Sequence, residues 1–228
     1  MHIPARAIVG FAAFSLLIPA SLLLAGGDPG WTMGWALAAL FVVSMVGSRL
    51  VAIKKSPGLV QERARFGGAE DAEPWDRWLS LLVGLVGPFS TVVVAGLDHR
   101  FRGSSGVPST LQTVSMGVVA LGYLLAIWAM LENAFFSAVV RIQRDRGHTV
   151  VGTGPYAVVR HPAYAGGILS TLATPFALNA LWALIPSCLT IIVLVHRTSL
   201  EDRTLRRGLA GYEGYAARVK SRLLPGVW

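Results

Sequence analysis

Two polar stretches near the C-terminal end of the chain contain residue types that could hold a polar or anionic ligand. The first covers residues 148–167 and reads HTVVGTGPYAVVRHPAYAGG, and the second begins at Arg197. Within the first, Gly152-Thr-Gly-Pro predicts a tight turn, where glycine lets the backbone approach a ligand closely. Arg160-His161-Pro162 then leads into an apolar helix, because proline suits the first helical position, where its missing N–H would be unpaired anyway.

The chemistry predicted for the first stretch is anion binding. A helix N-terminus carries roughly half a positive charge and free N–H donors, and Arg160 would add a full charge beside it. The alternative is that Arg160 and His161 are interface residues that hold lipid headgroups. Both interpretations place this stretch at a membrane surface.

The second stretch begins with Arg197 and Glu201, which are one helical turn apart. Such a pair contributes only about 0.2–0.5 kcal/mol on a solvated helix face. Here it leaves an apolar segment directly, where an uncompensated charge is costly and usually functional. The arginines at 203, 206 and 207 are predicted to contact anionic lipids, and Tyr212 and Tyr215 to anchor or pack a terminal helix.

The elements that must position these residues are membrane helices. The chain has 228 residues, 54% of them hydrophobic and 14% charged, and its mean hydropathy is +0.57. A soluble domain is nearer a quarter charged. Uncharged runs at 7–27, 29–48, 78–97 and 109–131 each suit one crossing of about 20 residues. Ala7–Ala25 exceeds the about 7–15 apolar residues of a signal peptide and lacks a small-residue cleavage site, so we expect a first transmembrane helix.

The last apolar run, 163–195, is too long for one crossing and short for two. Pro175, Asn179 and Pro186 interrupt it, which predicts a helical hairpin with arms at roughly 162–178 and 181–199 that do not both cross fully. With six passes and a cytoplasmic N-terminus, 18 of the 20 Lys and Arg residues face the cytoplasm, as the positive-inside rule requires. The predicted fold is therefore an all-α, polytopic membrane bundle of about six helices, with both termini cytoplasmic.

We expect two regions, residues 1–131 with four transmembrane helices and residues 132–228 with the functional site. The segment 49–77 is interpreted as an interfacial linker on lipid headgroups, and its action as a lid is left open. The net charge of +8 lies mostly between apolar runs, which favours membrane lipids over nucleic acid as the partner. One cysteine, Cys188, and histidines without ligand spacing predict no metal site.

The motifs together resemble one known family. The chain is similar to the isoprenylcysteine carboxyl methyltransferases in its motifs and their order. These motifs are Gly147-His148, the pattern GTGPYxxxRHPxYxG, an apolar hairpin, RxxxED, and a terminal YxxY followed by RLxP. The wider group includes phospholipid N-methyltransferases. The resemblance covers about residues 132–228, whereas residues 1–131 agree only in being membrane-spanning.

This resemblance implies a binding site for S-adenosylmethionine between the loop and the hairpin flanks, without a Rossmann domain. Glu201 matches the first residue of the family's acidic pair, whereas Asp202 departs from its second glutamate by one methylene. Arginines matching Arg160 and Arg197 approach the acceptor carboxylate in the family, so Arg160, Arg197 and Glu201 are the implied catalytic residues. The implied cofactor-binding residues are His148, Val150, Gly154, Tyr156, His161, Pro162, Tyr164, Gly166, Glu201 and Asp202.

The expected function is S-adenosylmethionine-dependent methyl transfer to a hydrophobic or membrane-embedded acceptor, at the cytoplasmic face of a multi-pass membrane protein. A carboxylate acceptor is favoured because the arginines would repel a charged amine. Prenylated cysteine, a fatty or polyketide acid, a phospholipid amine and a small thiol all stay open as acceptors. The alternatives are an NAD(P)H-dependent membrane reductase of sterol-reductase-like architecture and a non-enzymatic lipid-binding protein. The interpretation requires positions 160 and 201 to lie at the same membrane face.

Overall fold

The chain folds into a bundle of long helices. The structure, a computed structural model, describes residues 5–55, 58, 62, 72–101, 103 and 106–228, and these contain no strand. The longest helices are α1 (Ala5–Gly26), α2 (Thr32–Lys55), α6 (Ser109–Glu132) and α8 (Leu184–Gly208), and the shorter α5 (Gly87–Phe101) lies between α2 and α6 in the chain. The all-α prediction is confirmed.

Five helical stretches of the described chain are long and apolar enough to cross a membrane. The third combines α4 (Asp76–Leu81), the π-helical turn η1 (Leu82–Val86) and α5. The fifth of the six predicted helices, α7 (Pro162–Ala177), has only 16 residues, which at about 1.5 Å per residue is too short for a full crossing. The protein is therefore a multi-pass integral membrane protein. Its candidate spans are Val9–Gly26, Thr32–Lys54, Asp76–Phe101, Ser109–Glu132 and Leu181–Gly208.

The C-terminal hairpin forms as predicted from its proline and asparagine residues. Pro162 is the first residue of α7, and the chain reverses at Asn179, whose φ is +51°. The Asn179 side-chain oxygen accepts a hydrogen bond from the Val107 N–H at 3.0 Å, which ties the turn to the segment before α6. The second arm was predicted to end at residue 199, but α8 continues to Gly208 because its charged side chains pair within the protein and leave the helix intact.

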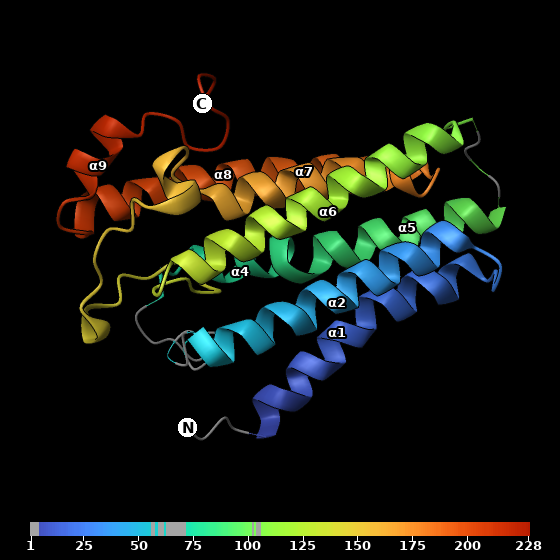
Figure 1. Cartoon of the computed structure of the whole chain (residues 1–228), viewed down its shortest axis with the longest axis horizontal. Helices are drawn as coiled ribbons and strands as arrows, with labels where there is room; N and C mark the ends of the chain where they lie inside the picture. The colour runs from blue at the N-terminus through green and yellow to red at the C-terminus, as the bar shows by residue number, and fades with distance from the viewer. Residues whose placement is uncertain (1–4, 56–57, 59–61, 63–71, 102, 104–105) are drawn as a thin grey trace.

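The bundle brings the polar segments to one end. In Figure 1 the start of α1, the end of α2, the segment between α6 and α7, and α9 (Tyr212–Arg218) all lie at the left, whereas the α1–α2 and α7–α8 turns lie at the right. The two flanks of the hairpin therefore return to the same end of the bundle. The expectation that positions 160 and 201 share one face is confirmed, since Arg160 binds Asp202, the neighbour of Glu201.

Helices α6 and α7 pack closely through glycine. A Cβ placed on Gly166 would lie 2.4 Å from the carbonyl oxygen of Gly122, so no side chain fits at this crossing. The resemblance placed Gly166 at the cofactor pocket, but in the structure it faces α6. The physical reason is that helix association in lipid relies on small residues that let backbones approach closely.

We expect Gly166→Ala to destabilise the protein, because the added methyl group meets backbone that cannot move aside. Overpacking of this kind costs about 1–3 kcal/mol. Gly167→Ala is the matched control, since its Cβ would lie 3.7 Å from a Leu194 methyl group in ordinary contact. Thermal unfolding in detergent should separate the two variants, and equal melting temperatures would contradict the assignment of Gly166 to the helix contact.

Candidate active site

A pocket opens at the end of the bundle where the hairpin flanks meet. The empty space there is about 790 Å³, with the open mouth included. Of the residues implied by the resemblance, seven line it: His148, Val150, Tyr156, Arg160, His161, Tyr164 and Glu201. Gly154, Pro162, Gly166, Arg197 and Asp202 are not part of its lining. The remaining wall consists of Asn133, Phe135, Phe136, Ser137, Val139, Val140, Arg141, Thr149, Val151, Ala163, Leu205, Leu209, Tyr212 and Tyr215.

A chain of hydrogen bonds leads from the bundle interior to Glu201 in the pocket wall. The Tyr164 hydroxyl donates to Oε2 of Glu201 at 2.5 Å and accepts from Nη1 of Arg197. Asp76 holds the Arg197 guanidinium through two bonds of 2.7 and 3.0 Å. The other Glu201 oxygen, Oε1, has no hydrogen-bond partner among the described residues. Glu201 thus presents a fixed carboxylate with one oxygen left for a ligand.

Asp76 is a site residue that the sequence analysis missed. It is fully buried at the start of α4, and besides Arg197 it accepts the Val140 N–H at 2.7 Å. Glu62 is likewise buried and binds Arg141 at 2.8 and 2.9 Å. The linker interpretation of 49–77 therefore fails at these two positions, because a buried arginine needs a counter-charge. Residues 56–57, 59–61 and 63–71 of this segment lie outside the described residues, so the question whether it acts as a lid stays open.

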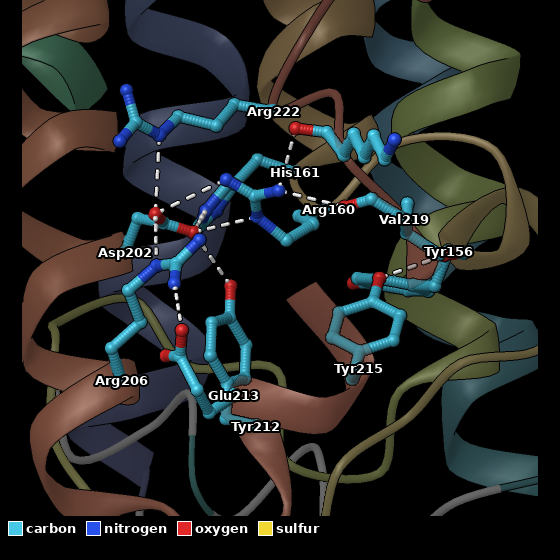
Figure 2. A network of polar contacts seen from close by, with 11 residues as sticks. Tyr156, Arg160, His161, Asp202, Arg206, Tyr212, Glu213, Tyr215, Val219 and Arg222 are labelled. Carbon is cyan, nitrogen blue, oxygen red and sulfur yellow. Dashed lines mark hydrogen bonds and ion pairs between the residues drawn. The ribbon is translucent and has the colours of Figure 1, made fainter. Parts of the chain in front are cut away.

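Asp202 is the centre of a buried polar network (Figure 2). Its carboxylate is fully buried and accepts hydrogen bonds from Arg160 at 2.8 and 3.2 Å, Arg206 at 3.2 Å, Arg222 at 3.1 Å and the Tyr212 hydroxyl at 3.0 Å. Arg206 was predicted to contact lipid, but it binds Asp202 and Glu213, because residues four apart on a helix lie on the same face. In this position Asp202 holds the chain together beside the pocket; its predicted contact with a cofactor stays a prediction.

Arg160 fastens the C-terminal segment to the pocket. Beyond Asp202, its Nη1 donates to the carbonyl oxygens of Val219 and Lys220 at 2.7 and 2.8 Å. The backbone adds two bonds, since the N–H groups of Arg160 and His161 donate to the carbonyls of Ser221 and Arg222. Four of the five N–H donors of Arg160 are thereby occupied. One donor, on Nη2, has no partner among the described residues.

His161, in the pocket lining, has a buried Nε2 atom whose one close polar neighbour in the described part of the chain is the Asp202 carboxylate. Its Nε2 lies 3.6 Å from Oδ1 of Asp202, too far for a hydrogen bond, and has no hydrogen-bond partner among the described residues. The imidazole stacks on the Tyr164 ring with 5.7 Å between centroids. Because a buried polar atom without a partner is costly, a polar ligand group bonded to Nε2 would be stabilised here.

Comparison with known proteins agrees with this geometry. The family model of the isoprenylcysteine carboxyl methyltransferase (ICMT) family matches residues 114–207. The chain is 30% identical over 176 residues to the protein-S-isoprenylcysteine O-methyltransferase of Schizosaccharomyces pombe, covering 69% of this chain and 74% of the relative. The chain belongs to the isoprenylcysteine carboxyl methyltransferase family. It is also 30% identical over 101 residues to the lamin-B receptor of Drosophila melanogaster, which is 42% of this chain and 14% of that protein.

The part that matches the ICMT family model covers α7, Arg197 and Glu201 but not the whole site. Asp76 precedes it, and Tyr212 and Tyr215 follow it. The Tyr215 hydroxyl donates to the Tyr156 carbonyl oxygen at 2.7 Å, which docks α9 on the glycine turn. Burial raises the pKa of Tyr215 to about 12 and raises that of Tyr156 as well, so both rings are uncharged at neutral pH. An aromatic wall of this kind favours a cationic ligand.

His148 enters the site of this ICMT-family chain as a neutral ring. Its Nδ1 accepts the Gln143 N–H at 3.3 Å, and the ring stacks on Phe135 at 4.6 Å. Burial lowers the pKa of His148, and the charges of Arg141 and Arg146 lower it further. A histidine whose pKa is lowered by folding stabilises the fold above its ordinary pKa of about 6.5 and loses this contribution as the pH falls through the folded value. The loop should therefore be most stable at neutral and higher pH.

The glycine turn is held in shape by Gly154 and Glu132. Gly154 has φ +55°, and a Cβ there would lie 2.9 Å from the carboxyl carbon of Glu132. The Thr153 hydroxyl donates to Oε1 of Glu132 at 2.5 Å, so the end of α6 fixes the turn. Gly154 thus shapes the pocket indirectly, because it sets the path of the backbone over residues 152–157.

We expect Gly154→Ala to lower the stability of the protein, because it combines a disfavoured backbone conformation with a collision. Gly147→Ala is the matched control: its φ is +64°, but nothing lies within 4 Å of the added Cβ. The control should cost only the left-handed backbone strain of about 1–2 kcal/mol. Thermal unfolding of both variants tests this, and an equal loss of stability in both would show that the Glu132 contact is unimportant.

Proposed function

We propose that the protein transfers a methyl group from S-adenosylmethionine to a carboxylate on a hydrophobic acceptor, at the cytoplasmic face of the membrane. The observation that supports this most is the convergence of the two hairpin flanks around one pocket, with the Glu201 carboxylate fixed in its wall by Tyr164. Membership of the ICMT family supports the same reaction class.

The residues of the pocket suit S-adenosylmethionine. The ligand has two cationic groups, a sulfonium and an ammonium, and Glu201 Oε1 and the rings of Tyr156 and Tyr215 favour positive charge. The ligand also has many hydrogen-bonding atoms, and His161 Nε2 is a buried atom that needs one. We assign His148, Val150, Tyr156, His161, Tyr164 and Glu201 to its binding, with Gly154 and Pro162 shaping the backbone around it.

When bound, S-adenosylmethionine supplies an electrophilic methyl group on a positively charged sulfur. The acceptor needs no general base, because a carboxylate is already deprotonated at neutral pH. Phe135, Phe136 and Val139 form an apolar part of the wall, and exclusion of water by the bound substrates would favour a step in which opposite charges neutralise one another. The protein therefore contributes by binding and orienting the cofactor and the acceptor and by keeping water away from them.

Arg160 lines the pocket and orients the acceptor without masking it, whereas Arg197 lies outside the lining and holds the Tyr164 hydroxyl. Asp76 and Asp202 each occupy two of the five N–H donors of their arginine. The Tyr164 hydroxyl and a backbone carbonyl occupy two more on Arg197, and two backbone carbonyls occupy two more on Arg160, which leaves one N–H on each. An arginine with one N–H to offer binds a carboxylate through a single hydrogen bond instead of a bidentate pair, so one carboxylate oxygen stays nucleophilic. Orientation of this kind is a large source of rate acceleration.

A methyl-transfer assay tests the proposal. The protein in nanodiscs is incubated with tritiated-methyl S-adenosylmethionine and a membrane lipid extract, and the labelled lipids are treated with alkali. A carboxyl methyl ester releases volatile labelled methanol, whereas a methylated amine retains its label. Absence of labelled product with every acid offered, or label that resists alkali, would overturn the proposed reaction. Binding of NADPH without binding of S-adenosylmethionine would favour the reductase.

A further inference from the structure

Asp76 is connected to Glu201 by a series of hydrogen bonds that crosses α4, α8 and α7. The Asp76 carboxylate, fully buried at the start of α4, accepts from Nε and Nη2 of Arg197 at 2.7 and 3.0 Å. Nη1 of Arg197 donates to the Tyr164 hydroxyl, which in turn donates to Oε2 of Glu201 at 2.5 Å. Asp76 does not line the pocket, so any effect that it has on a ligand passes through these contacts.

Arg197 requires a counter-charge because of where it lies. Its side chain is only 6% exposed, and it belongs to the candidate membrane span Leu181–Gly208. A buried guanidinium without a carboxylate partner is strongly unfavourable. Asp76 supplies this carboxylate with both of its oxygens, in the bidentate arrangement that suits the planar guanidinium of arginine.

Glu201 is a second carboxylate within reach of Arg197. The two residues are four apart on α8, a spacing that places side chains on the same helix face and permits an ion pair. In the part of the chain that the structure describes, Arg197 nevertheless forms no direct ion pair with Glu201. Asp76 holds its guanidinium, and the Tyr164 hydroxyl bridges the two groups. Glu201 therefore keeps its Oε1 for a ligand.

We propose that Asp76 is a positioning residue that keeps Glu201 available to the cofactor by neutralising Arg197. Without the Asp76 charge, Arg197 pairs with Glu201, one helical turn away, and that carboxylate no longer attracts a cationic ligand. Asp76 also accepts the Val140 N–H at 2.7 Å and so fixes a backbone segment of the pocket wall. This proposal rests on the proposed function, because that function assigns S-adenosylmethionine to Glu201.

Calorimetric titration with S-adenosylmethionine in nanodiscs tests the proposal through a double substitution. Asp76→Asn keeps the shape of the side chain but removes its charge, and we expect it to weaken binding about tenfold or more. Asp76→Asn combined with Arg197→Gln removes both charges of the buried pair, so no guanidinium is left to capture Glu201. We expect the double variant to bind about tenfold more tightly than Asp76→Asn alone, whereas a purely structural role of Asp76 predicts that the second substitution weakens binding further.

Thermal unfolding without cofactor separates this proposal from the proposed function. Glu201→Gln should clearly lower the melting temperature in the Asp76→Asn background, where Glu201 has become the partner of Arg197. It should lower the melting temperature only slightly in the wild type, where Asp76 has that role. An equal effect in both backgrounds would overturn the proposal. Absence of S-adenosylmethionine binding in the wild type would count against the proposed function alone, because the thermal comparison needs no cofactor.

Asp98→Asn is the matched control for a general loss of stability. Asp98 is another buried aspartate, whose Oδ2 accepts the Trp182 N–H at 3.1 Å beside the α7–α8 turn, at the opposite end of the bundle (Figure 1). We expect this variant to have a lower melting temperature but an unchanged affinity for S-adenosylmethionine. A loss of affinity as large as that of Asp76→Asn, or a double variant that binds no better than Asp76→Asn, would overturn the proposal.

Discussion

Glu201→Gln is expected to lower the kcat/KM for methyl transfer by about a hundredfold or more while the protein stays folded. Glutamine keeps the shape of the side chain and can still accept the Tyr164 hydroxyl, but it loses the negative charge beside the cationic ligand. Removing one partner of a desolvated charge pair costs about 2–5 kcal/mol, and each 1.4 kcal/mol is a factor of ten. Tritiated-methyl transfer and calorimetric titration with S-adenosylmethionine measure the effect.

The matched control for this prediction is Glu213→Gln. Glu213 is an exposed carboxylate on α9 that binds Arg206 at 2.5 Å outside the pocket, so its loss should change neither binding nor rate measurably. If Glu201→Gln bound S-adenosylmethionine as tightly as Glu213→Gln, Glu201 would have no role in holding the cofactor.

Asp202→Asn is expected to produce the largest loss of stability among single substitutions in this site. Asp202 is buried and is the shared acceptor of Arg160, Arg206 and Arg222, so its neutralisation leaves the buried Arg160 without its counter-charge. Breaking a buried ion pair by removing one partner costs about 3–5 kcal/mol. We expect a clearly lower melting temperature in detergent and release of the C-terminal segment to proteolysis.

Asp145→Asn is the control for the stability prediction. Asp145 also accepts from an arginine, Arg141 at 3.2 Å, but its side chain is half exposed, and exposed ion pairs contribute about 0–1 kcal/mol. A melting temperature for Asp202→Asn equal to that of Asp145→Asn would show that the network in Figure 2 does not hold the C-terminal segment.

Glu201 and Asp202 are adjacent but have different roles, because successive side chains of an α-helix point about 100° apart. Glu201 faces the pocket and Tyr164, whereas Asp202 faces the C-terminal segment. The family resemblance grouped the two as one acidic pair at the cofactor. Their separate tasks depend on what lies on each side of α8, which motif spacing does not contain.

Much of the fold could be predicted from local patterns. The uncharged runs located the transmembrane helices, and Pro175 and Asn179 located the hairpin turn, because crossing length and turn chemistry depend only on neighbouring residues. The sequence analysis placed the end of α8 too early, because the charged residues that follow the apolar run were taken to lie beyond the helix. The pairing of those charges inside the protein extended it to Gly208.

The residues of the site were predicted in part. His148, Tyr156, His161, Tyr164 and Glu201 do line one pocket, as their motif order suggested. The contribution of Asp76 had no local signal, because its partner Arg197 is 121 residues away in the chain. Tyr212 and Tyr215 were interpreted as anchoring or packing residues, and only the docking of α9 on the glycine turn shows that they form part of the wall.

The amino-acid sequence by itself determined that this protein spans a membrane several times and that its last apolar segment turns back. Both properties follow from free energies that are local, namely the cost of unpaired backbone and charge in lipid. Only the tertiary structure decided which carboxylate neutralises which buried arginine and which glycine serves a helix contact. The desolvation cost requires every buried charge to have a partner. Which residue becomes that partner depends on the packing of helices that are distant in the sequence.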